Sequence, residues 1–403
     1  MRRRYLLISL TIALVIAACG EDISGDTTEA GDEPITTTTA STSTAPPDVS
    51  LTDARSALED MNDPSFPEPL VDPAEIISGG PPPDGIPPID NPSFIDVDAA
   101  DEWISDTEPV VYLEANGEVH AYPIQVLMWH EIVNDTVGGI PVAVTYCPLC
   151  NSAVSYRREV AGEVTTFGTS GRLFASALVM YDRSTESLWT HFDGRAVVGV
   201  LTGASLEPIS SPLLAWSDFK EAFPEALVLD RDATGFDRPY GVNPYDGYDN
   251  QDTNPFLFRG SLDERAQAKQ RVVGVNVGGE SVAWTLDAIS GGDARATQGD
   301  VGDTPIVIFW KQGQSSALDA SQIEDGRDVG SVGVFSPELD GRTLTFQADG
   351  DGFIDAETGS LWDITGRAVS GELAGAELEQ IHHLDTFWFA WSTYRPGSDL
   401  IES

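Results

Sequence analysis

Basic residues are scarce in this sequence. Its 22 lysines and arginines stand against 65 aspartates and glutamates, which gives a formal net charge of −43 at pH 7. Binding to nucleic acid depends on cationic side chains that neutralise phosphates. We therefore expect no nucleic-acid partner, and acidic lipid headgroups are expected to repel the chain.

Long apolar runs are equally scarce, and the one that stands out lies at the N-terminus. Three arginines at positions 2–4 precede an apolar stretch at 5–15, which is too short to span a membrane. The segment Ile16-Ala17-Ala18-Cys19 then places small residues before a cysteine, the lipobox pattern. We expect a lipoprotein signal peptide over residues 1–18 and lipidation at Cys19. The mature chain is then an extracytoplasmic protein of the cell envelope, and its membrane partner is reached through the lipid anchor.

Residues 19–68 are rich in serine, threonine and proline, with runs such as Thr36-Thr37-Thr38-Thr39. Such a composition does not bury enough apolar surface to form a core. We predict a disordered linker that lifts the folded part away from the membrane. The remaining residues are long enough for two domains.

An internal repeat organises the rest of the chain. An earlier series of motifs returns later in the same order and at nearly the same spacing: Asp182, Thr185, Ser187-Leu188-Trp189 and Gly194-Arg195-Ala196-Val197 recur as Asp355, Thr358, Ser360-Leu361-Trp362 and Gly366-Arg367-Ala368-Val369. We interpret this as two homologous β-rich halves, residues 69–230 and 265–403. A turn-rich connector over 231–264 joins them.

Strand patterns dominate both halves. The runs 141–146 and 306–310 are rich in β-branched and aromatic residues, and Asn116-Gly117 and Gly138-Gly139 are typical hairpin turns. The few predicted helices cover 123–133 and 217–223. Because strands and helices do not alternate as βαβ units, we predict an α+β fold of mainly antiparallel sheets.

One short motif carries most of the chemistry, Cys147-Pro148-Leu149-Cys150, directly after the strand at 141–146. It allows three interpretations: a redox-active thiol pair, two ligands of a soft metal ion such as Cu or Zn, or a structural disulfide. A disulfide that closes so short a loop gains only about 2 kcal/mol. Unlike in thioredoxin, residues 152–156 that follow are predicted to form a strand, so no helix dipole would lower the pKa of a thiol.

Histidines and one carboxylate are the candidate helpers. His130 and Glu131 lie on the predicted helix 123–133, where Glu131 falls on the apolar face and needs a partner or a raised pKa. We name both as catalytic candidates beside the cysteines, and His130 as an alternative metal ligand. His383 could reach the cysteines from the second half and is a further alternative ligand. A structural role is the competing interpretation for each.

The repeat offers an internal control. Cys147 and Cys150 correspond to Lys311 and Gln314 in the second half, so the repeated scaffold does without the cysteines. Any chemistry is therefore expected in the first half. The aromatic, turn-rich segment 240–249 would line a binding cleft or serve as a packed connector.

The chain resembles the domain-of-unknown-function 3179 family of bacterial exported proteins. The motifs that carry the resemblance cover most of the chain after the linker: Asp84-Gly85-Ile86-Pro87, Trp129-His130-Glu131-Ile132-Val133-Asn134-Asp135, Thr145-Tyr146-Cys147-Pro148-Leu149-Cys150-Asn151-Ser152, Phe167-Gly168-Thr169-Ser170-Gly171 and Phe387-Trp388-Phe389-Ala390-Trp391. Some relatives are labelled as possible selenoproteins, which implies electron-transfer chemistry at Cys147 and Cys150. His191 departs from the residue expected in relatives, so the resemblance gives it no catalytic role.

These observations lead to one main hypothesis and one alternative. The main hypothesis is a membrane-tethered thiol oxidoreductase or redox carrier in which one of Cys147 and Cys150 is the nucleophile and the other resolves. His130 or Glu131 would assist proton transfer, and the redox partner is not specified. The alternative is a non-enzymatic lipoprotein that binds a metal ion or ligand, or whose cysteines form a structural disulfide.

Overall fold

The computed structural model describes residues 54–402. The predicted signal peptide, Cys19 and the predicted linker up to residue 53 lie outside these residues. Within the described part, none of the helices combines the length and apolarity that crossing a bilayer requires. Residues 54–68, which the sequence assigns to the linker, include apolar side chains that pack against the folded protein, and Ala57 is fully buried there.

The first sheet arises from a hairpin at Asn116-Gly117, as predicted. Asn116 and Gly117 both have positive φ, 51° and 78°, the conformation that a tight two-residue hairpin turn requires. The sheet has the order β15 (Leu213–Ala215), β3 (Pro109–Ala115), β4 (Glu118–Pro123), β16 (Leu227–Leu229) and β2 (Phe94–Asp96). Its pairs are antiparallel except for β16 and β4, which run parallel.

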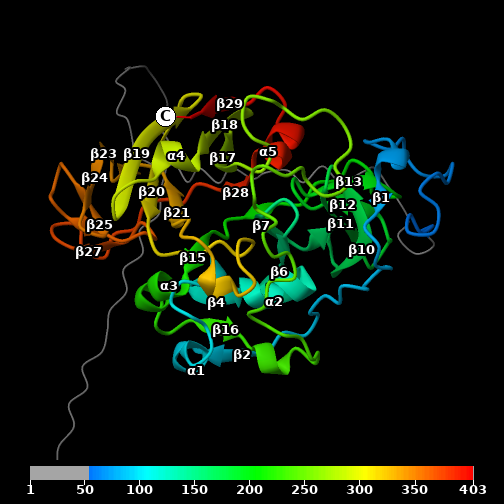
Figure 1. Cartoon of the computed structure of the whole chain (residues 1–403), viewed down its shortest axis with the longest axis horizontal. Coiled ribbons are helices and arrows are strands. Elements are labelled where there is room, and N and C mark those ends of the chain that lie inside the picture. The colour runs from blue at the N-terminus through cyan, green and yellow to red at the C-terminus, as the bar shows by residue number, and fades with distance from the viewer. Residues whose placement is uncertain (1–53, 403) are drawn as a thin grey trace, which may run out of the picture. The chain divides into compact units, whose positions relative to one another are not determined.

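The second sheet carries the cysteines. Its order is β14 (Pro208–Ile209), β7 (Ser152–Arg157), β6 (Ile140–Cys147) and β5 (Ile132–Val137). The predicted turn at Gly138-Gly139 joins β5 to β6. Helix α2 (Ile124–His130) lies beside β6 (Figure 1).

A third sheet completes this part of the chain. It has the order β1 (Ile77–Ser78), β10 (Phe167–Phe174), β11 (Ala177–Asp182), β12 (Leu188–Thr190) and β13 (Arg195–Val198). A bulge between Thr169 and Arg172 interrupts the pairing of β10 with β11. A small hairpin connects the second sheet to the third; it consists of β8 (Glu159–Val160) and β9 (Glu163–Val164).

The later part of the chain has three sheets of similar order. They are β28 (His383–Phe387), β17 (Arg271–Val277), β18 (Glu280–Thr285) and β29 (Asp399–Ile401); then β19 (Ala294–Val301), β20 (Thr304–Lys311) and β21 (Ser331–Phe335); then β24 (Phe346–Asp349), β25 (Gly352–Asp355), β26 (Leu361–Trp362) and β27 (Ala368–Ser370). As in the first sheet, the one parallel pair of this set joins β18 to β29. The duplication itself stays a prediction.

Short helices and a last hairpin fill the connections. They are α1 (Val97–Asp101), α3 (Trp216–Ala222), α4 (Leu286–Ile289), α5 (Trp388–Tyr394), the 3-10 turns η2 (Pro73–Glu75), η3 (Arg231–Ala233) and η4 (Ile323–Asp325), and hairpin β22 (Glu338–Leu339) with β23 (Arg342–Thr343). Strands account for 40% of the structure and helices for 11%. The predicted class, mainly antiparallel β with few helices, is confirmed.

The helix predicted over 123–133 is shorter than expected. It begins after Pro123 and ends at His130, because Glu131 adopts a positive φ of 58° and β5 begins at Ile132. Glu131 therefore caps the helix and does not lie on its apolar face. The helix predicted over 217–223 is observed one residue earlier, as α3.

Candidate functional site

The two cysteines lie at the ends of a tight turn between adjacent strands. Cys147 is the last residue of β6 and pairs with Ser152, the first residue of β7. The backbone N–H of Asn151 donates to the Pro148 carbonyl at 3.2 Å, and Asn151 has a positive φ of 49°. The predicted strand after Cys150 is thus confirmed, and no helix begins at the cysteines.

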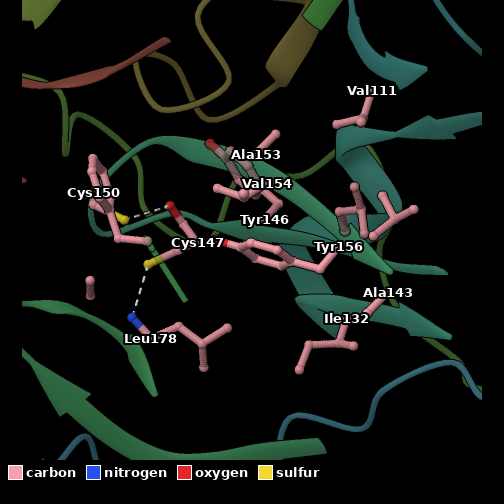
Figure 2. Close-up of a cluster of buried hydrophobic side chains, with 14 of the residues drawn as sticks. Val111, Ile132, Ala143, Tyr146, Cys147, Cys150, Ala153, Val154, Tyr156 and Leu178 are labelled. Carbon is pink, nitrogen blue, oxygen red and sulfur yellow. Dashed lines mark hydrogen bonds between the residues drawn. The ribbon is translucent and has the colours of Figure 1, made fainter. Parts of the chain in front are cut away.

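Both sulfurs are buried and are not joined by a disulfide; Cys147 is 1% exposed and Cys150 is fully buried. The backbone N–H of Leu178 donates to Cys147 Sγ at 3.4 Å, and Cys150 Sγ lies 2.9 Å from the hydroxyl of Ser152. Figure 2 shows Cys147 facing Leu178 while Cys150 turns toward the Cys147 carbonyl, with Tyr146 and Tyr156 nearby.

The two thiols have opposite pKa shifts. Burial acts to raise the pKa of Cys147, but hydrogen bonds from the Cys150 thiol and from the Leu178 backbone outweigh it and lower that pKa below its usual value. Burial raises the pKa of Cys150 well above the usual value, and its role as donor to Cys147 raises it further. Cys147 is therefore the thiol that ionises first.

The later part of the chain holds this turn through its backbone. The Cys150 carbonyl accepts two hydrogen bonds, from Thr386 Oγ1 at 2.8 Å and from the Phe387 N–H at 3.1 Å. Because β28 supplies both donors, the position of Cys150 is fixed from outside its own sheet.

His191 completes a cluster with the two cysteines. It follows β12 directly, and one ring nitrogen of His191 and the two Sγ atoms all lie within 4.8 Å of one another. The backbone of Leu178 links the parts, since its N–H donates to Cys147 Sγ and its carbonyl accepts from the His191 N–H at 3.1 Å. Two thiols and an imidazole at this spacing form a group that could hold a metal ion.

The imidazole of His191 lacks the partners that a buried polar group normally has. It is fully buried, and neither ring nitrogen has a hydrogen-bond partner among the described residues. Burial lowers the pKa of His191 to about 3, so the ring is neutral at physiological pH. A neutral ring nitrogen with a free lone pair next to two sulfurs has the properties of a metal ligand.

Sequence reasoning assigned His191 no role, whereas the structure places its ring beside the two cysteines. Spacing gave no signal, because His191 is far from the cysteines along the chain and meets them through the pairing of β11 with β12.

His130 does not belong to this cluster. Its Nδ1 lies 2.7 Å from the Pro87 carbonyl and its Nε2 lies 2.7 Å from the Tyr240 hydroxyl. A carbonyl only accepts, so Nδ1 donates to Pro87 and Nε2 accepts from Tyr240. Burial lowers the pKa of His130, which agrees with this neutral form. Both nitrogens are occupied, and His130 has no free one to offer a metal or a thiol.

His383 also lies outside the cluster. Its Nδ1 bonds to the Ile381 carbonyl at 3.0 Å, and burial lowers the pKa of the ring. The predicted approach of this segment to the cysteines is made by the Thr386 and Phe387 backbone region and not by the histidine.

Glu131 faces a pocket beside the cysteines. Burial raises its pKa well above the usual value, and the nearby charge of Cys147 raises it further. The pocket measures about 280 Å³ and is mainly apolar, with Leu149 and Leu178, neighbours of the cysteines, in its wall. Tyr245 and Tyr248, from the turn-rich segment 240–249, line it as well, so this segment forms part of the pocket wall.

The chain belongs to the DUF3179 family, described as proteins of unknown function, which it matches over residues 83–398. The family resemblance inferred from the motifs is confirmed. No curated protein and no solved structure matches the chain. Its function therefore has to be argued from the site.

Proposed function

We propose that this member of the DUF3179 family binds a soft transition-metal ion, Cu(I), through Cys147, Cys150 and His191. One observation carries the proposal: a fully buried imidazole with no hydrogen-bond partner lies within 4.8 Å of two buried sulfurs. A buried polar group without a partner costs about 1–3 kcal/mol, and a metal ion bound to the ring nitrogen would remove that cost.

The donor set favours Cu(I) over the alternatives. Thiolate sulfur selects soft ions such as Cu(I), and imidazole is a common ligand of copper. Structural zinc sites take four protein ligands, whereas this cluster supplies three within the described residues. The buried position of all three would also exclude water and oxidants from the ion.

The local electrostatics suit a thiolate ligand. Metal binding requires a deprotonated thiol and releases its proton. The hydrogen bonds to Cys147 already lower its pKa, so this sulfur binds first, and the ion would then favour deprotonation of Cys150.

The test is an anaerobic Cu(I) titration of the full chain against a chromophoric copper chelator. We expect one Cu(I) per chain. Cys147→Ser, Cys150→Ser and His191→Ile should each lower the affinity by more than about a hundredfold, because even loss of an outer-shell partner costs 10- to 100-fold.

His382→Ile is the matched control, since Nδ1 of His382 is also buried without a partner but lies outside the cluster. It should leave the Cu(I) affinity unchanged. The proposal is wrong if wild-type protein and His191→Ile bind Cu(I) equally well. If the chain binds Zn²⁺ more tightly than Cu(I) and does so through a fourth ligand, the site is a zinc site and not a copper site.

A second candidate function rests on the opposite pKa shifts of the two thiols. In this alternative, the Cys147 thiolate attacks one sulfur of a partner protein's disulfide; the partner S–S bond breaks, its other sulfur leaves as a thiolate that takes up a proton, and a mixed disulfide with Cys147 forms. Cys150 then gives up its proton and attacks Cys147 Sγ, and the partner sulfur held there leaves and takes up a proton. The partner disulfide is thereby reduced to two thiols and a Cys147–Cys150 disulfide forms. Glu131, whose pKa is raised, would hold or return a proton.

Burial argues against this second function, because thiol exchange needs an accessible thiolate and the two sulfurs are 1% and 0% exposed. A redox titration of metal-free protein separates the candidates. A reduction potential below about −300 mV would mark a structural disulfide and remove the redox function.

We also propose that the lipobox directs acylation of Cys19, which would place the metal site on the outer side of a membrane. The apolar run at 5–15 and the linker composition support this location. Labelling with a radioactive fatty acid should mark the wild-type chain and not Cys19→Ala.

A further inference from the structure

Glu131 holds a carboxyl group in an unusual place. It ends α2 with φ 58° and ψ −30°, a conformation in which a side chain is strained and glycine is common. Its backbone is fixed on both sides, since its N–H donates to Leu127 at 2.7 Å and its carbonyl accepts from Tyr146 at 2.9 Å. The side chain is therefore aimed by a rigid backbone.

The carboxyl group itself has no hydrogen-bond partner in residues 54–402, although Glu131 is only 6% exposed. It lies in the wall of the pocket next to the cysteines. A nine-tenths buried carboxyl without a protein partner, facing a cavity, indicates that a ligand group supplies the partner.

The rest of the wall defines what kind of molecule fits. Most of the lining is apolar or aromatic, including Leu173, Leu178 and Phe256. The polar groups beside Glu131 are engaged: Thr169 Oγ1 donates to the Ile86 carbonyl at 2.7 Å, and Tyr248 OH donates to the Leu149 carbonyl at 3.0 Å. Arg172, whose side chain donates to the Leu58 carbonyl at 3.2 Å, and Tyr245 also line the pocket. Glu131 therefore supplies the one carboxyl group in a mainly apolar pocket.

We propose that this pocket binds a small, uncharged, mainly apolar organic molecule whose carbonyl oxygen accepts a hydrogen bond from the Glu131 carboxyl. Burial raises the pKa of that carboxyl well above its usual value, which favours the protonated form, the form that donates. The cavity of about 280 Å³ fits a molecule of one or two rings. This proposal does not rest on the proposed metal binding, but Leu149 and Leu178 lie in the pocket wall beside the cysteines, so occupancy of one site would affect the other.

The experiment compares three probes of one shape on the full chain: 1-tetralone, which has a carbonyl, tetralin, which lacks it, and tetralin-1-carboxylate. Dissociation constants are measured by ligand-observed NMR in the presence of EDTA, and competition among the probes tests for a shared pocket. We expect 1-tetralone to bind about fivefold more tightly than tetralin, the effect of one net hydrogen bond. The carboxylate should bind more weakly than either.

Two variants at Glu131 and one at the rim sharpen the test. Glu131→Leu removes the donor and should abolish the preference for 1-tetralone while tetralin still binds. Glu131→Gln keeps a donor and should retain the preference. Phe256→Ala should weaken both compounds alike, since Phe256 offers only apolar contact.

Three results would overturn the proposal. The first is that neither neutral probe binds at millimolar concentration. The second is an equal preference for 1-tetralone in wild type and Glu131→Leu. The third is tightest binding of the carboxylate, which would assign the pocket to an anion held by Arg172.

Discussion

The connections β6–β7 and β20–β21 stand at the same place in two similar sheets, yet they differ in every chemical respect. Cys147 pairs with Ser152 across a tight turn, whereas Lys311 pairs with Ser331 across a long segment, 312–330, that includes η4. Lys311 forms an ion pair with Asp218 at 2.8 Å. One connection gathers soft donors, and the other begins at a largely buried ion pair.

A similar contrast appears beside Trp189 in β12 and Trp362 in β26, which lie in the sheets that follow along the chain. His191 follows Trp189 by two residues, and Ile364, also buried, follows Trp362 by two residues. The scaffold around them is shared: the Asp182 carboxylate accepts from Thr185, Ser187 and Trp189, and Asp355 accepts from the matching Thr358, Ser360 and Trp362. The aspartate network is therefore present in both regions, whereas the Cys-Cys-His cluster is present in the first region and replaced by other residues in the second.

The largest loss of stability is expected when the aspartate hydrogen-bond network, which both regions share, is removed. Asp182→Ala and Asp355→Ala should each lower the free energy of unfolding by ~4 kcal/mol, because two backbone N–H groups and an indole N–H lose their acceptor in a buried site. The midpoint of urea unfolding measures both.

Glu186→Ala is a suitable control, because Glu186 lies in the same turn but its side chain makes none of these bonds. It should change stability by less than ~0.5 kcal/mol. If only one of the two aspartate variants is strongly destabilised, the two networks are not equivalent and the comparison fails.

A smaller change in stability is expected when the residues that differ between the regions, His191 and Ile364, are exchanged. His191→Ile should raise the stability of the metal-free protein by ~2 kcal/mol at pH 7, since it removes two unpartnered buried nitrogens. Ile364→His should lower stability by a similar amount, because no sulfur or other donor cluster receives the ring there.

The effect of His191→Ile depends on pH. The pKa of His191 is about 3 in the folded protein and about 6.5 when unfolded, so between these values only the unfolded chain takes up the proton. The free energy of unfolding of the wild type therefore falls by ~1.4 kcal/mol per pH unit as the pH drops below 6.5, and that of His191→Ile does not. The free energy of unfolding of His191→Ile should exceed that of the wild type by ~4 kcal/mol at pH 5. An advantage that stays constant from pH 7 to 5 would show that His191 has a hydrogen-bond partner.

Local patterns predicted much of the fold. Two-residue turns with asparagine or glycine at positive φ set the hairpins at Asn116-Gly117 and Gly138-Gly139, and β-branched runs set β6 and β20 within two residues of the expected ends. The length of α2 could not be predicted, because its end depends on a positive φ at Glu131 that no local pattern requires.

The site was predictable only in part. The spacing of Cys147 and Cys150 marks them as candidates, but His191 reaches them through strand register. Leu178 bonds to Cys147 and His191 through its backbone, and its leucine side chain gives no sequence signal of that role. His130 was favoured because it is close to the cysteines in sequence. Its true partners, Pro87 and Tyr240, come from segments that only tertiary structure brings to it.

The smallest expected effect concerns the turns that open the two matching hairpins. Asn116-Gly117 joins β3 to β4, and Gly278-Gly279 joins β17 to β18, with all four residues at positive φ. Gly278→Asn should raise stability by about 0.4–1 kcal/mol, because asparagine tolerates this φ and has less conformational freedom than glycine in the unfolded chain. A Cβ at Gly278 meets nothing within 4 Å, so no clash opposes the gain. Thermal unfolding measures it, and Gly278→Val, whose branched side chain resists positive φ, should be destabilising instead. A loss of stability in Gly278→Asn would mean that the two hairpin turns differ in more than sequence.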